Sequence, residues 1–298
     1  MNKLRLTLLL SLGIGGCALF AQDNDRAPAK NRLALQTANF QGELSWVEQP
    51  SSSAPLGTLI GIHGTPGSWS AWQPLMAQPG IEAYSFYAFD RPGWADSQSS
   101  DGEVFTSLAD QADLLALAID QLPSVSPLIL VAHSWGGPVA LALAARYPDL
   151  IDGLVLIAAP ADPDVTQPRW YHKAAKIGPI KWLIGQEMAR SNLEMLSLAD
   201  ELQVLAPQLA HIGAPTVIMQ GKKDWLVAPQ NAFYLDRMLV NTNHELRYDL
   251  EANHFIPFKK TDAVLAAIHW VTEQTSVSGQ VSGQVSGQAS SEQALAER

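Results

Sequence analysis

One serine stands out as a candidate for chemistry. Ser134 lies within residues 131–137, which read VAHSWGG. The apolar residues 127–131 predict a buried strand, and residues 138–147 have a pattern typical of a helix. A strand, a sharp turn and a helix expose a serine hydroxyl above a sheet, where free N–H groups at the helix N-terminus stabilise an oxyanion. This context predicts a nucleophile, although Ala132 stands where a glycine is usual.

A nucleophilic serine needs a base, and the base needs a carboxylate that orients it. In folds with this serine arrangement, the acid and then the histidine follow along the chain. Asp224 follows a strand-like run at residues 215–221, and His254 follows the next such run at residues 244–250. Loops at the carboxyl edge of a parallel sheet assemble sites of this kind. We therefore expect Asp224 to orient His254, and His254 to be the base.

Other residues compete for these two roles. Some proteins with this order carry the acid after the preceding strand, where Asp162 and Asp164 lie in this chain. His133 is next to the serine, but we expect the sharp turn to direct its side chain elsewhere. The remaining histidines fall in a predicted lid, a strand, a helix or a different motif.

A motif upstream of the serine supports the same chemistry. Residues 58–62 predict a short apolar strand, which ends in His-Gly-Thr-Pro-Gly-Ser at residues 63–68. An N–H from the first strand-to-helix loop commonly completes an oxyanion hole together with the N–H that follows the nucleophile. The two expected donors are Thr65 and Trp135.

A further predicted strand, residues 84–89, leads to Asp-Arg-Pro-Gly-Trp at residues 90–94. With these motifs the chain resembles the α/β-hydrolase superfamily, in the branch that carries His-Gly-x-Pro-Gly and Asp-Arg-x-Gly loops. The resemblance covers roughly residues 33–274. It implies a mostly parallel eight-stranded sheet with helices on both faces and a helical lid insertion. Serine at position 134 argues against epoxide hydrolases and haloalkane dehalogenases, which resemble this branch but carry aspartate there.

The resemblance implies a serine hydrolase that cleaves carboxylic esters through an acyl-enzyme, with no metal or organic cofactor. A proline-iminopeptidase-like aminopeptidase and a carbon–carbon bond hydrolase share this triad and stay open as alternatives. A non-catalytic binding protein of the same fold is an alternative of another class. An aminopeptidase requires acidic lid residues to hold a free amine. Four acidic residues of the lid could serve, Glu187, Glu194, Asp200 and Glu201, but charges on a helix surface are the commoner explanation.

Tryptophans give the only hint of substrate. Four of the nine stand beside motif positions, and two more fall in the predicted lid. These six are Trp69, Trp94, Trp135, Trp225, Trp170 and Trp182. Most are explained by packing under loops, but aromatic surface near a serine favours an apolar or aromatic ester as the small-molecule substrate.

The N-terminus has the features of an export signal. A basic start is followed by an apolar run that is too short to span a bilayer. Residues 14–17 read IGGC, which resembles a bacterial lipobox, and Cys17 is the only cysteine. We expect Cys17 to be lipidated, so that an exported protein is held on a membrane. The alternative is an ordinary secretory signal cut near Ala21, but Leu19 occupies the position where that cut needs a small residue.

The whole chain of 298 residues is long enough for one large α/β domain. Its formal net charge of −10 disfavours nucleic acid as a partner, because binding it requires a basic face. The oligomeric state stays open. The expected segments are a signal peptide (1–16), a lipid-anchored tether (17–32), the core (33–160 and 214–275), a lid (161–213) and a disordered low-complexity tail (276–298).

Overall fold

The computed structural model describes residues 30–276, apart from residues 38, 101, 103 and 176–182. The predicted signal peptide, Cys17, Trp182 and almost all of the predicted tail lie outside the described residues. No helix in the described part of the chain is both long and apolar enough to cross a bilayer.

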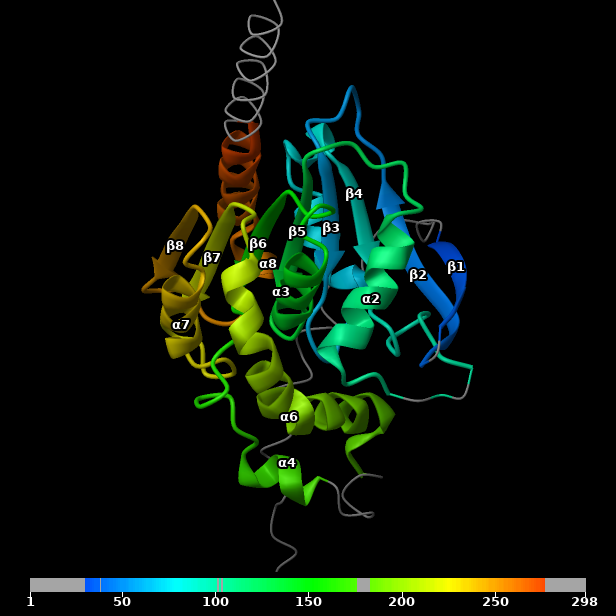
Figure 1. Cartoon of the computed structure of the whole chain (residues 1–298), viewed down its shortest axis with the longest axis vertical. Coiled ribbons are helices and arrows are strands. Elements are labelled where there is room, and N and C mark those ends of the chain that lie inside the picture. Colours follow the sequence, from blue (N-terminus) through cyan, green and yellow to red (C-terminus); the bar gives the residue numbers. More distant parts are fainter. Residues whose placement is uncertain (1–29, 38, 101, 103, 176–182, 277–298) are drawn as a thin grey trace, which may run out of the picture.

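An eight-stranded sheet forms the centre of the molecule, in the order β1-β2-β4-β3-β5-β6-β7-β8 (Figure 1). β2 runs antiparallel to both of its neighbours, and the other pairs are parallel. The expected mostly parallel sheet is therefore confirmed. The strands are β1 (Lys30–Gln36), β2 (Gln41–Gln49), β3 (Thr58–Ile62), β4 (Ser85–Phe89), β5 (Leu128–His133), β6 (Gly153–Ile157), β7 (Thr216–Gly221) and β8 (His244–Asp249).

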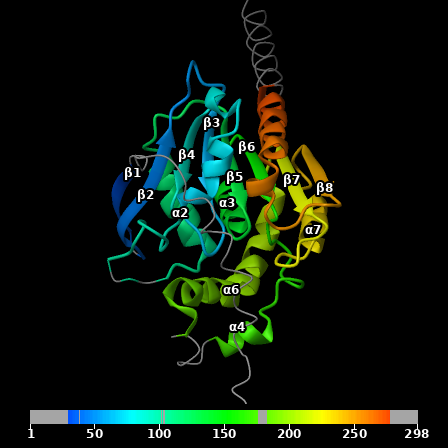
Figure 2. The same cartoon turned by 180° about the vertical axis from the view of Figure 1, so that it is seen from behind.

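Helices cover both faces of this sheet. α2 (Leu108–Ile119), α3 (Gly136–Arg146) and α7 (Gln230–Met238) lie on one face, shown in front in Figure 1. The other face carries α1 (Gln73–Met76), α8 (Ile256–Lys259) and a helix over residues 261–276, shown in front in Figure 2. Two apolar cores result, one on each side of the sheet.

The central strands supply both cores because successive side chains of a strand point to opposite faces. In β5, Leu130 packs into the core under α2 and α3, whereas Ile129 and Val131 pack into the core on the opposite face. All six residues of β5 are buried. A continuous apolar strand is what a parallel sheet covered on both faces requires.

The lid segment follows β6 and lies beyond the carboxyl ends of the parallel strands (Figure 1). It contains α4 (Trp170–Ala174), α6 (Gln186–Leu205) and a 3-10 turn, η3 (Ala206–His211). The predicted helical stretch within the lid corresponds to α6.

Both expected ends of the core need adjustment. β1 begins at Lys30, so residues 30–32 are strand rather than tether. Its burial alternates along the strand, and Arg32 and Lys30 point outward to Glu43 and Asp96. These charges resemble a polar tether in the sequence, but they occupy the exposed side of an edge strand. At the other end, residue 276, which we assigned to the tail, is still helical.

Candidate active site

The turn between β5 and α3 holds Ser134 in a strained conformation. Its φ is +52°, in the left-handed region that costs a non-glycine residue about 1–2 kcal/mol. The strain is held by backbone hydrogen bonds from the N–H of Ser134 to Ile157 (2.9 Å) and from Gly137 to the carbonyl of Ser134 (2.8 Å). Strain kept in place by its surroundings is typical of functional sites.

Two glycines let the backbone come close to this serine. A Cβ at Gly64 would lie 2.8 Å from the Cβ of Ser134, and a Cβ at Gly136 would lie 2.3 Å from the carbonyl oxygen of Ile62. Both distances are shorter than van der Waals contact. The loop after β3 therefore lies directly against the serine, as its predicted oxyanion role requires.

Asp224 and His254 meet at the carboxyl edge of the sheet, 30 residues apart in sequence. The loops after β7 and β8 carry them, and Nδ1 of His254 donates to Oδ2 of Asp224 at 2.8 Å. With its hydrogen on Nδ1, a neutral His254 has Nε2 free as a base. Both side chains are almost entirely buried.

The Asp224 carboxylate is fixed by further donors. Gln220 Nε2 donates to Oδ2 at 3.1 Å, and the N–H groups of Leu226 and Val227 donate to Oδ1 at 2.9 Å each. Burial raises the pKa of Asp224, but the hydrogen bonds from His254 and the two N–H groups outweigh it, so that the pKa is lowered overall. The carboxylate is thus held ionised and in one orientation. Gln220, a buried residue, was not among the sequence candidates.

The alternative acids lie elsewhere. The carboxylate of Asp162 accepts the N–H of Asp164, and the N–H of Asp162 donates to Asn231. Among the contacts of the described residues, neither aspartate reaches His254. Asn231 is buried and also binds the N–H of Ala161, so it anchors the start of the lid.

His133 lies beside the site, and our expectation that it points elsewhere is wrong. Its ring centroid is 4.7 Å from that of His254, and its Nε2 donates to the carbonyl oxygen of His254 at 2.9 Å. Burial and, next, the positive form of His254 lower the pKa of His133 to about 3. The two-residue period explains its placement, because His133 shares the strand face of Val131, which α8 covers.

The two expected oxyanion donors have unpaired N–H groups. Across the described residues, no backbone or side-chain acceptor takes the N–H of Thr65 or of Trp135. Trp135 is the N-cap of α3, so its N–H is among those that a helix start leaves without a partner. The structure therefore leaves both donors available on the two segments that flank Ser134.

Comparisons with known proteins agree with this architecture. A family model for the alpha/beta hydrolase fold matches residues 57–178. The chain also superimposes on solved structures, among them a monoacylglycerol lipase from Paleococcus ferrophilus with a TM-score of 0.60 and 18% identity. That superposition covers 77% of this chain and 98% of the lipase. The protein has the alpha/beta hydrolase fold.

Parts of the chain are also similar to curated proteins. Epoxide hydrolase 1 of Caenorhabditis elegans is 26% identical over 68% of this chain and 49% of its own length. Pimeloyl-(acyl-carrier protein) methyl ester esterase of Shewanella woodyi is 36% identical over 34% of this chain and 35% of its own length. The chain thus spans about half the length of the first relative and about a third of the second.

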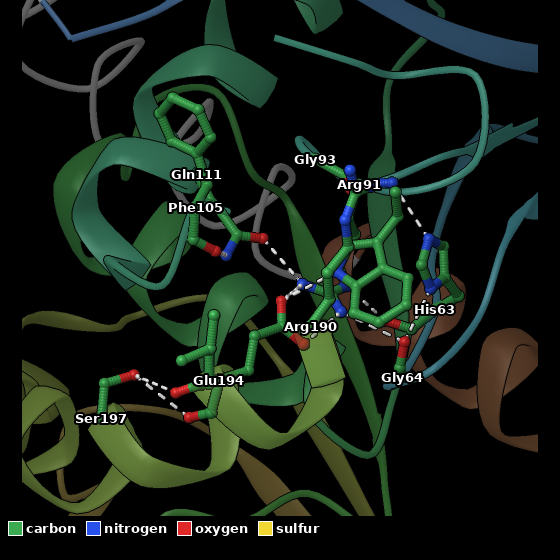
Figure 3. Close-up of polar contacts among 11 residues, drawn as sticks. His63, Gly64, Arg91, Gly93, Phe105, Gln111, Arg190, Glu194 and Ser197 are labelled. Carbon is green, nitrogen blue, oxygen red and sulfur yellow. Dashed lines mark hydrogen bonds and ion pairs between the residues drawn. The ribbon is translucent and has the colours of Figure 1, made fainter. Parts of the chain in front are cut away.

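One acidic residue of the lid is not a surface charge. Glu194 on α6 is fully buried and forms a bidentate pair with Arg91 of the Asp-Arg-Pro-Gly-Trp loop, at 2.8 and 3.1 Å (Figure 3). The expectation of a helix-surface charge is therefore wrong for Glu194, because α6 turns this position toward the core. Glu201 is half-buried and accepts the N–H of Leu108. Glu187 and Asp200 are exposed.

Of the six motif and lid tryptophans, the five that the structure describes divide into buried and exposed groups. Three of the motif tryptophans are buried under the loops, namely Trp69, Trp94 and Trp135. Trp225 and Trp170 are 64% and 79% exposed. Packing therefore accounts for the first group, and Trp170 lies on the outside of the lid.

Proposed function

We propose that this protein is a serine hydrolase that cleaves carboxylic esters. The observation that carries the proposal is the hydrogen-bonded pair of Asp224 and His254 at the sheet edge that also carries the strained Ser134. Curated relatives and structural neighbours whose names denote hydrolases, lipases and esterases support the same reading.

Each group has a defined task in the proposed reaction. Nε2 of His254 takes the proton of Ser134 while the hydroxyl oxygen attacks the ester carbonyl, and Asp224 stabilises the imidazolium that forms. The N–H groups of Thr65 and Trp135 donate to the oxyanion. His254 then protonates the leaving alcohol, and the acyl group stays on Ser134. Water activated by His254 attacks the acyl-enzyme, which releases the carboxylic acid and restores the serine.

Two alternatives are less well supported. An aminopeptidase needs an acidic lid group for the free amine, but Glu194 is buried and paired with Arg91, and Glu201 already accepts the N–H of Leu108. The other two candidates, Glu187 and Asp200, are exposed. Aspartate would stand at position 134 in an epoxide hydrolase of the branch that the sequence resembles, and this chain has serine. An apolar or aromatic acyl group is our proposal for the substrate, supported by the many tryptophans around the motif loops.

A fluorophosphonate probe tests the nucleophile. The probe should label the wild-type protein, and Ser134→Ala should lose both labelling and ester turnover. Ser197→Ala is a matched control, because its hydroxyl bonds only to carbonyls of its own helix. Labelling of Ser134→Ala at the wild-type rate would refute the assignment.

We also propose that the protein is exported and anchored through a lipid on Cys17, supported by the lipobox-like residues 14–17. Bacterial lipoproteins carry several acyl chains, and more than one chain is needed for stable anchoring. Intact mass of the protein expressed in a bacterium should give a mature chain that begins at Cys17 with added lipid. A mature chain that begins at Gln22 without lipid would contradict the proposal.

A further inference from the structure

Arg91 is bound at every donor of its guanidinium group. An arginine side chain has five N–H donors in a planar fork. Nε donates to the carbonyl of His63 at 2.8 Å, and Nη2 donates to the carbonyl of Gly64 at 3.2 Å and to Glu194. Nη1 donates to Glu194 and to Gln111, at 2.8 Å each. The side chain is fully buried, and these contacts hold it in one position (Figure 3).

The carbonyl of Gly64 belongs to the same peptide group as the N–H of Thr65, the expected oxyanion donor. Two donors hold this oxygen, Nη2 of Arg91 and Nδ1 of His63 at 2.7 Å. In a planar trans peptide the C=O and the N–H point in opposite directions. Fixing the oxygen on the Arg91 side therefore fixes the direction of the Thr65 N–H. A charged donor on the oxygen also polarises the peptide and strengthens its N–H as a donor.

His63 strengthens the same arrangement. Its Nε2 accepts the N–H of Arg91 at 3.0 Å, while its Nδ1 donates to Gly64. One neutral tautomer satisfies both contacts. Burial and, next, the charge of Arg91 lower the pKa of His63 well below its usual value, which keeps the ring neutral.

The second oxyanion donor also contacts Arg91. The guanidinium lies over the ring of Trp135, with Cζ 4.6 Å from the ring centroid. On the other side, Glu194 of lid helix α6 binds both Arg91 and Nε1 of Trp94, the latter at 2.9 Å. One side chain thus links the lid to both segments that carry the donors.

We propose that Arg91 is the residue that positions the oxyanion hole, and that Glu194 makes this positioning depend on the lid. Arg91 and Glu194 touch neither substrate nor Ser134 in this scheme and act through the Gly64–Thr65 peptide and Trp135. Packing of α6 against the core and alignment of the Thr65 and Trp135 N–H groups then occur together. The inference rests on the proposed serine esterase function.

Arg91→Lys and Glu194→Gln separate positioning from charge. Lysine keeps the charge but loses the planar fork, and glutamine replaces one acceptor oxygen by an N–H₂ group that faces the guanidinium. With a small acetate ester we expect Arg91→Lys to lower kcat by about 10- to 100-fold, which is less than the 10²–10³ lost with a whole donor. Glu194→Gln should lower kcat by about 3- to 10-fold, which is a still smaller part of the loss that removing a whole donor causes. KM should stay within about twofold in both, because ground-state binding is not what the donors favour.

Two inhibitors report on the oxyanion directly. A trifluoromethyl ketone forms a tetrahedral oxyanion adduct with the serine, whereas the matching methyl ketone binds mainly as the free carbonyl. In both variants the inhibition constant of the trifluoromethyl ketone should rise by the factor by which kcat/KM falls, and that of the methyl ketone should not change. Glu201→Gln is the matched control, because Glu201 lies on the same helix and joins α6 to the N–H of Leu108. It should leave both constants unchanged.

The inference is overturned if the two ketones weaken in parallel, if neither weakens, or if Glu201→Gln matches Glu194→Gln. Circular dichroism and thermal unfolding identify any variant that does not fold. If Arg91→Lys does not fold, Glu194→Gln decides the question with the same inhibitors. Failure of the proposed function would look different, because fluorophosphonate would then not label the wild-type protein.

Discussion

Two buried acid–base pairs share the same closest distance and have different consequences. Asp224 and His254 approach to 2.8 Å, and so do Glu194 and Arg91. A histidine can change its charge between pH 5 and 8, whereas a guanidinium stays protonated throughout the range in which proteins are folded. The first pair can therefore move a proton, and the second can only hold a position. At equal distance, the basic partner therefore determines whether a pair can transfer a proton or only hold side chains in place.

Asp224→Asn should have the largest effect of the changes that test this comparison. Asparagine cannot hold the imidazole in the required tautomer, so we expect kcat to fall by up to ~10⁴-fold while the fold is kept. Ester turnover and thermal unfolding of the purified variant measure the two quantities. Asp162→Asn is the control and should keep turnover within about twofold. The acid is misassigned if the Asp162 variant is inactive and the Asp224 variant is not.

Glu194→Ala, which breaks the pair of Glu194 with Arg91, should lower the stability of the protein. Removing one partner of a buried ion pair leaves an uncompensated charge and costs about 3–5 kcal/mol of unfolding free energy. Urea denaturation at pH 7 measures this loss. Adding Arg91→Met should recover part of it, since apolar residues replace buried pairs at little cost. A loss under about 1 kcal/mol in the single variant would mean that the pair does not hold the lid.

His133→Gln should make stability less sensitive to acid. The pKa of His133 is lowered to about 3 in the fold, so from pH 6.5 down to 3 the unfolded chain binds the extra proton, and stability is lost as pH falls. Between pH 7 and 5 this one group can account for up to about 2 kcal/mol. Urea denaturation at both pH values should show a smaller drop for the variant. An equal drop in both proteins would exclude His133 as a source of the acid sensitivity.

Trp170→Ala should have the smallest effect. Trp170 lies in the lid, and each CH₂ of an acyl chain buried against a lid side chain would contribute up to ~0.8 kcal/mol. Trp170 is 79% exposed, so its truncation should change the chain-length profile of kcat/KM on p-nitrophenyl esters by less than about twofold. Trp94→Phe is the comparison variant, since Trp94 touches Glu194. A marked flattening in Trp170→Ala would place an acyl chain against the outside of α4.

The sequence determined the parts of the site that follow single strands. Ser134, Asp224 and His254 each come directly after a predicted strand, and parallel strands bring their carboxyl ends to one edge of a sheet. The meeting of Asp224 with His254 therefore follows from local pattern and topology. The central strands could also be predicted from their apolar runs, because a strand buried on both faces has few polar positions.

Only the tertiary structure decided the roles of Arg91, Glu194 and His133. Arg91 and Glu194 are 103 residues apart, and an acid in an amphipathic helix is usually a solvated charge. Its burial depends on how α6 is rotated when it packs, which a helical pattern with mixed polar and apolar faces does not fix. The contact of His133 with His254 depends likewise on which face of β5 the loop into α8 covers. Local pattern fixes where a chain turns and which strands are buried, and the packing of separate elements decides which polar side chains meet.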